Sequence, residues 1–143
     1  MRFIAVDRSI EIEYDDNVWK ASENFQGSIV TFRAPEENKD GFAPTLSVFE
    51  YPDNPIPLRQ IMENTIEQIS KMLSDLYYEI VDQDRTKVEF TYSGLVNGVK
   101  LKLYQRIERR RHIYSITYGC DSARYERYEK EFDALLSNIM YEQ

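Results

Sequence analysis

The stretch that decides the fold covers residues 87–120 and reads KVEFTYSGLVNGVKLKLYQRIERRRHIYSITYGC. β-Branched and aromatic residues recur in it at the spacing of β-strands over residues 87–92, 99–107 and 112–118. Asn97-Gly98 joins the first two of these segments and is the typical sequence of a two-residue hairpin turn. The stretch therefore predicts an antiparallel meander.

The last two strands of this meander carry large side chains on both alternating faces, as strands do when both sides of a sheet are covered. The side chains concerned are Leu101, Leu103, Tyr104, Ile113, Tyr114, Ile116 and Tyr118. We therefore expect these two strands to lie in the centre of a sheet, with other elements packed on each side.

Further strand patterns precede the meander. Ile10-Glu-Ile-Glu-Tyr14 alternates apolar and acidic residues, which is typical of a half-buried strand, and residues 29–33 and 46–51 are β-favouring runs that proline ends. Polar residues at 36–41 connect these two runs, so we expect the runs to be antiparallel neighbours. A short strand at residues 78–81 is also predicted.

Two segments have the periodicity of amphipathic helices. Residues 58–76 form one predicted helix, and the second follows Asp121 or Ser122 as N-cap and continues to Ile139. The predicted fold is α+β: a central antiparallel β-sheet of about six to seven strands, covered by two long helices on opposite faces. This α/β/α sandwich forms a single domain over residues 1–143.

The composition limits the possible functions. A chain of 143 residues with 42% hydrophobic and 13% aromatic residues can bury one core and is not disordered. The net charge of −7 repels nucleic acid and anionic lipid, and no apolar run approaches the ~20 residues that span a bilayer. We expect no nucleic acid binding and no membrane insertion. The single Cys120 favours a reducing, cytoplasmic location, or a periplasmic or extracellular one if a leader has been removed before Met1.

Motifs of catalysis and cofactor binding are absent from the sequence. It lacks the glycine patterns that cradle phosphates or form nucleophile elbows, and His112 and Cys120 lie at opposite ends of one predicted strand. Glu11 and Glu13 share a strand face, but their alternation with apolar residues is that of a solvent-exposed face. We expect no enzyme, cofactor or metal site. The alternative is a small-ligand or metal-dependent enzyme with a site built from scattered carboxylates.

An arginine cluster is the first candidate for partner binding. Arg106, Arg109, Arg110 and Arg111 lie near the predicted turn between the last two strands of an otherwise acidic protein. Such a cluster would bind an acidic protein segment or a phosphate. As charges at a hairpin tip, these arginines would equally prevent edge-to-edge pairing of sheets.

Three tyrosines are the second candidate. Tyr104, Tyr114 and Tyr118 would form a recognition surface, since tyrosine offers a large contact area together with a polar group. They would otherwise pack a helix on the sheet.

Three segments resemble the PsbP-like superfamily, which includes DcrB-like proteins and Ran-binding nuclear-import factors. They are residues 10–19, which end in Trp19, residues 45–48, and Asn97-Gly98 followed by residues 112–118. The resemblance covers nearly the whole chain and implies a central antiparallel sheet with helices on both faces. It also implies a non-enzymatic binder, stabiliser or chaperone.

These observations together predict a non-catalytic protein-binding module, chaperone or adaptor with an unidentified protein partner, present as a monomer or weak dimer. The resemblance implies two specific forms of this function. One is a DcrB-like chaperone of type VI secretion effectors, which shelters apolar helices, and the other is a binder of small GTPases.

Overall fold

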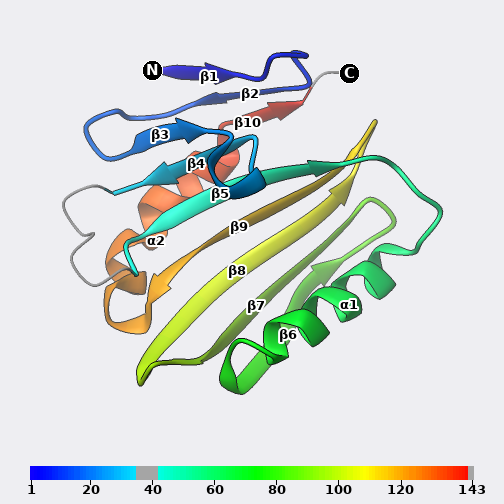
Figure 1. Cartoon of the computed structure of the whole chain (residues 1–143). Helices are drawn as coiled ribbons and strands as arrows, with labels where there is room; N and C mark the ends of the chain where they lie inside the picture. Colours follow the sequence, from blue (N-terminus) through cyan, green and yellow to red (C-terminus); the bar gives the residue numbers. More distant parts are fainter. Residues whose placement is uncertain (35–41, 142–143) are drawn as a thin grey trace.

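The computed structural model describes residues 1–34 and 42–141, which form a large and a small antiparallel sheet with two α-helices (Figure 1). The predicted α+β class is therefore confirmed, while the predicted connection at residues 36–41 lies outside the described residues. In chain order the elements are β1 (Arg2–Ile4), β2 (Ile10–Glu13), β3 (Lys20–Glu23), the 3₁₀ helix η1 (Phe25–Gly27), β4 (Val30–Arg33), β5 (Thr45–Tyr51), α1 (Leu58–Ser70), β6 (Ser74–Gln83), β7 (Lys87–Val96), β8 (Val99–Arg109), β9 (Ile113–Asp121), α2 (Ser122–Ser137) and β10 (Ile139–Tyr141).

The large sheet has seven strands in the order β3-β4-β5-β9-β8-β7-β6, and each neighbouring pair is antiparallel. β7, β8 and β9 form the predicted meander. Asn97 and Gly98 have φ angles of 50° and 79°, the left-handed conformation that a tight hairpin turn requires. β8 and β9 lie inside the sheet, as expected, and β5 is the antiparallel neighbour of β4.

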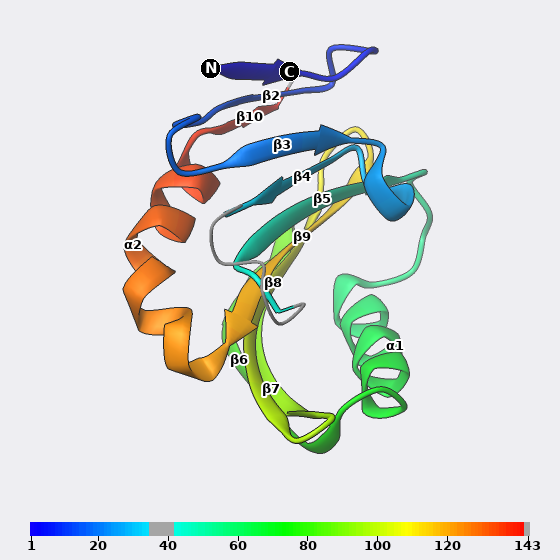
Figure 2. The same cartoon turned by 60° about the vertical axis from the view of Figure 1, so that its left-hand side comes forward.

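The small sheet joins β2 to strands from both ends of the described chain. β2 lies between β1 and β10, and its Ile10 and Ile12 are fully buried. β1, β3 and β10, each three or four residues long, were not predicted from the sequence. β10 pairs with β2 across more than a hundred residues of chain, so both strands lie together at the top of Figure 2.

The first helix is shorter than the sequence pattern predicts. α1 ends at Ser70 and β6 begins at Ser74, so the predicted continuation of the helix to Leu76 is wrong. Asp75 has a φ angle of 51°, which redirects the chain into the strand. Leu73 and Leu76 fit the helical spacing because both pack into the same hydrophobic cluster as α1.

Buried hydrophobic residues form two clusters on the large sheet. One joins α1 to Val88 and Phe90 of β7, Ile107 of β8 and Ile113 of β9. The other joins α2 to Trp19 and to the even-numbered residues of β4, β5 and β9. Successive side chains of β9 therefore belong alternately to different faces of the sheet, as the strand pleat requires.

The second helix begins as predicted. Asp121 is the N-cap residue of α2, but its carboxylate pairs with Arg124 and makes no side-chain capping hydrogen bond. Neither helix of the described residues is long and apolar enough to cross a membrane.

Candidate functional site

Two adjoining pockets follow one face of β5. Thr45, Ser47 and Phe49 line the first pocket, and Tyr51, the next side chain on the same face, lines the second. These four residues extend over about 20 Å, at about 3.3 Å per residue of strand. We call these four side chains and the two pockets that they line the β5 groove.

The first pocket has a volume of about 380 Å³ and lies where β4, β5, β8 and β9 reach the same end of the sheet. Its walls combine apolar and polar side chains, and the guanidinium group of Arg33 lies over the ring of Phe25 at 5.0 Å from its centroid. Gly119 has no room for a side chain, because a Cβ atom there would lie 2.5 Å from the carbonyl oxygen of Lys102. The remaining lining residues are Gln26, Thr31, Phe42, Ala43, Leu101, Leu103 and Cys120.

A row of small polar side chains crosses the floor of the sheet beside this pocket. Thr31 lies opposite Ser47, Ser47 opposite Thr117, and Thr117 opposite Gln105. The hydroxyl groups of Thr31 and Ser47 are 3.0 Å apart and hydrogen bonded, and the amide of Gln105 donates to the hydroxyl group of Ser115 at 2.9 Å. The floor of the groove therefore consists of polar side chains, several of which are hydrogen bonded to one another.

The second pocket has a volume of about 620 Å³ and lies between α1 and the loop that precedes it. Arg109 holds this loop in place: it donates to Asp53 Oδ1 at 3.0 Å and to the carbonyl oxygens of Asn54 and Ile56 at 3.0 and 2.5 Å. Arg109 therefore positions one wall of the pocket. The other lining residues are Tyr51, Pro52, Ile61, Asn64, Thr65, Gln68 and Ile113.

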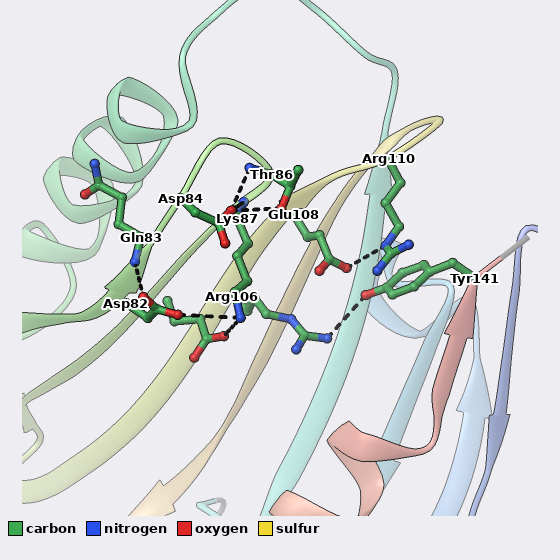
Figure 3. A network of polar contacts seen from close by, with 10 residues as sticks. Asp82, Gln83, Asp84, Thr86, Lys87, Arg106, Glu108, Arg110 and Tyr141 are labelled. Carbon is green, nitrogen blue, oxygen red and sulfur yellow. Dashed lines mark hydrogen bonds and ion pairs between the residues drawn. The ribbon is translucent and has the colours of Figure 1, made fainter. Parts of the chain in front are cut away.

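The structure divides the predicted arginine cluster, of which Figure 3 shows Arg106 and Arg110. Arg106 donates to the hydroxyl group of Tyr141 at 3.4 Å, and Arg110 pairs with Glu108 at 2.9 Å and lies 4.1 Å from the ring centroid of Tyr141. Arg109, by contrast, contacts the loop before α1, and Arg111 is exposed in the turn. The four arginines do not form one basic surface, because neighbouring residues of β8 point to different faces and acidic or aromatic residues meet most of them.

The three predicted recognition tyrosines lie in the core. Tyr104, Tyr114 and Tyr118 are only 6%, 2% and 5% exposed. Tyr118 stacks on Tyr104 and on Phe132 of α2, with ring centroids 4.6 and 4.5 Å apart. Burial raises the pKa of the Tyr104 and Tyr118 hydroxyl groups well above the ordinary value. The prediction that they form a partner surface is corrected: Tyr104 and Tyr118 pack with α2, and Tyr114 packs against Tyr141 of β10.

A third group of side chains has the composition of a metal site. Asp7, Glu50 and His112 each offer one ligand atom, and these atoms lie within 4.8 Å of one another. Hydrogen bonds from Ser9 lower the pKa of Asp7, and the charge of His112 lowers it further. No sequence pattern indicated this group, because its members come from three distant segments.

The comparison with known proteins identifies a fold. No family model and no curated protein matches the chain. The solution structure of cyanobacterial PsbP (CyanoP) from Synechocystis sp. PCC 6803 is similar with a TM-score of 0.61 and 16% identity, over 99% of this chain and 92% of that one. The protein thus has a PsbP-like fold, which confirms the resemblance seen in the sequence.

Two other solved structures are similar over the whole chain. LpqN, described as involved in cell envelope biogenesis of Mycobacterium tuberculosis, has a TM-score of 0.69 at 8% identity and is covered over 90% of its length. PA94 from Pseudomonas aeruginosa is described as a protein of unknown function and putative regulator. It has a TM-score of 0.63 at 15% identity, and 97% of its chain is covered. At such identities the likeness shows the fold alone.

Proposed function

We propose that this protein is a non-catalytic binding module, a chaperone or adaptor whose β5 groove holds an apolar segment of another protein. The observation that carries this proposal is the lining of the groove, in which apolar side chains lie beside hydroxyl-bearing and other polar ones. Such a surface buries apolar side chains of a partner while satisfying the polar groups of its backbone.

The arrangement of the helices leaves this face accessible. We propose that α1 and α2 cover opposite faces of the sheet, because the odd-numbered Ile113 belongs to the cluster of α1 and the even-numbered Tyr114 to that of α2. The main contacts of α1 with the sheet are made with β7 and β8. Among the described residues, neither helix lies over this face of β5 and β9 in Figure 1, and we propose that a partner binds there.

The ionisable side chains of the groove favour binding over catalysis. Among the described residues that line the two pockets, they are Arg33, Tyr51, Asp53 and Cys120. Arg33 lies over Phe25, and the carboxylate of Asp53 is paired with an arginine. General acid–base catalysis requires a proton donor and acceptor that converge on one point, whereas these groups are spread over both pockets.

The apolar side chains of the groove favour one specific form of the proposal. A chaperone of the DcrB-like type would shelter an apolar helix or strand of a secretion effector in the groove, while a small-GTPase binder would have to meet a larger and more polar surface. We propose the chaperone form, acting as a monomer in a reducing compartment, which suits the single buried Cys120.

Site-specific photo-crosslinking in the native cell tests the proposal. The photoreactive residue p-benzoylphenylalanine replaces Tyr51 in the groove, and in the control it replaces Tyr77 on β6, an aromatic residue of similar exposure at 64% against 50%. We expect a defined protein adduct from position 51 that is absent from position 77. The captured protein is then purified and its affinity for the unlabelled chain is measured by calorimetry.

A groove-filling variant completes the test. Ser47→Trp places a large ring over the floor of the first pocket and should weaken the measured affinity about tenfold or more, because it occupies the space of the partner side chains. Its thermal unfolding is measured in parallel to show that the fold is retained. Equal adducts from both positions, or unchanged affinity of a folded Ser47→Trp variant, would contradict the proposed surface.

A further inference from the structure

Three distant segments bring ionisable side chains together at the edge of the small sheet. Asp7 lies in the turn between β1 and β2, Glu50 near the end of β5, and His112 in the turn between β8 and β9. The imidazole Nε2 atom of His112 is 3.4 Å from Glu50 Oε1, and one ligand atom from each residue lies within 4.8 Å of the others. This group lies on the side of β5 opposite to Phe49 and Tyr51 and is separate from the β5 groove.

Ser9 orients both carboxylates of this group. Its backbone N–H donates to Asp7 Oδ1 at 3.0 Å, and its hydroxyl group donates to Glu50 Oε2 at 3.2 Å. Ser9 itself is 4% exposed, so its position is set by the surrounding structure. The other carboxylate oxygen of Glu50, Oε1, thereby points to His112. Hydrogen bonds from outer residues to ligand carboxylates are a regular feature of metal sites.

We propose that Asp7, Glu50 and His112 bind a divalent transition-metal ion of the Zn²⁺ class. A nitrogen ligand with two carboxylates suits such an ion, and three protein ligands leave one position open to water. Bonds of about 2.0–2.2 Å place the ligand atoms of a tetrahedral ion roughly 3.4 Å apart. The His112–Glu50 pair already has this spacing, and rotation of the exposed Asp7 side chain closes the remainder.

The bound ion would connect the two sheets. Asp7 belongs to the turn between β1 and β2 of the small sheet. Glu50 lies near the end of β5 in the large sheet, and His112 directly precedes the neighbouring strand β9. An ion that binds this folded arrangement and not the unfolded chain stabilises the fold in proportion to its concentration and affinity. The site therefore predicts a Zn²⁺-dependent rise of the unfolding temperature.

Calorimetric titration of ZnCl₂ into tag-free, chelator-treated protein tests the site. We expect one ion per chain and, in parallel, a shift of the imidazole ring signals in the NMR spectrum, which are simple to assign because His112 is the one histidine of the sequence. His112→Ala and Glu50→Gln should each weaken binding about tenfold or more, and Ser9→Ala about 10–100-fold.

Two variants serve as matched controls. Glu13→Gln removes a carboxylate of the small sheet that pairs with Arg2, and Cys120→Ser removes the single thiol. Both should leave the Zn²⁺ affinity within about twofold of wild type. An absence of binding by the wild-type protein, imidazole signals that do not respond to Zn²⁺, or equal affinity in folded His112→Ala would overturn the proposal. The ring signals of the wild-type protein decide the question even if a variant does not fold.

Discussion

The two sides of β9 have opposite chemistry. On one side Tyr114, Ile116 and Tyr118 are buried in the hydrophobic cluster that includes α2. On the other side, beyond Ile113, the strand carries Ser115, Thr117 and Gly119, which lie in or beside the β5 groove. One face of the same strand is thus a dry core, and the other is a floor of small and polar residues.

This difference changes how the aromatic residues of the sequence are interpreted. Tyrosine is enriched at binding surfaces, yet the central tyrosines of this protein pack a helix on a sheet. The β5 groove instead has residues that attract little notice in a sequence, such as Ser47 in its lining and Thr117 beside it. Small side chains leave space above the sheet.

Removal of a ring from the buried side should have the largest effect. Phe132 is fully buried and its ring lies 5.5 Å from that of Trp19 and 4.5 Å from that of Tyr118. Phe132→Ala should lower the free energy of unfolding by about 3–5 kcal/mol, because it leaves a cavity among these rings. Urea denaturation measures the change. Ser47→Ala on the groove side should cost less than about 1 kcal/mol, and similar losses in the two variants would contradict the distinction between the sides.

An added methyl group at Gly119 should have an intermediate effect. Its Cβ atom would lie 2.5 Å from the carbonyl oxygen of Lys102 and 2.8 Å from Leu103 Cγ. Because the first of these is a backbone atom of the neighbouring strand, Gly119→Ala should cost about 1–3 kcal/mol of unfolding free energy. Thr117→Ala, two residues earlier on the same side, is the control and should change the value by about 0.5 kcal/mol. An equally stable Gly119→Ala variant would show that β8 and β9 separate easily here.

Release of the loop at the second pocket should have the smallest effect on stability. Arg109→Ala removes the hydrogen bonds to Asp53, Asn54 and Ile56 and should cost about 1–2 kcal/mol, since the arginine is partly exposed. Hydrogen exchange should increase in residues 53–57 in particular. Arg59→Ala, whose exposed pair with Glu63 contributes a few tenths of a kcal/mol, is the control. Unchanged hydrogen exchange in residues 53–57 would show that Arg109 does not hold the loop that lines the second pocket.

Much of the fold was predictable from local patterns. The turn at Asn97-Gly98 and the alternation in β9 depend on neighbouring residues, and both predictions are confirmed. The end of α1 was not predictable from spacing, because Leu73 continues the apolar pattern into β6. β10 could not be predicted, since its pairing with β2 depends on contacts between the two ends of the chain.

The candidate sites were predictable only in part. Arg109 was singled out as a charge at a hairpin tip, but the structure makes it the anchor of a loop. Thr31 and Ser47 gave no signal, because hydroxyl residues are ordinary in strands. Glu50 and His112 are more than sixty residues apart and meet only because β5 and β9 are neighbours.

The sequence by itself determined most strands of the large sheet and the existence of both helices, that the protein is α+β with a central antiparallel sheet, and that it resembles the PsbP-like superfamily. These properties follow from turn chemistry and from the periods of two and 3.6 residues, which act over short distances along the chain. The tertiary structure alone decided which side chains line the pockets along β5, which arginine holds a loop, and that Asp7, Glu50 and His112 meet. Those outcomes depend on strand order and on helix placement, because the folded chain brings residues together that no local pattern relates.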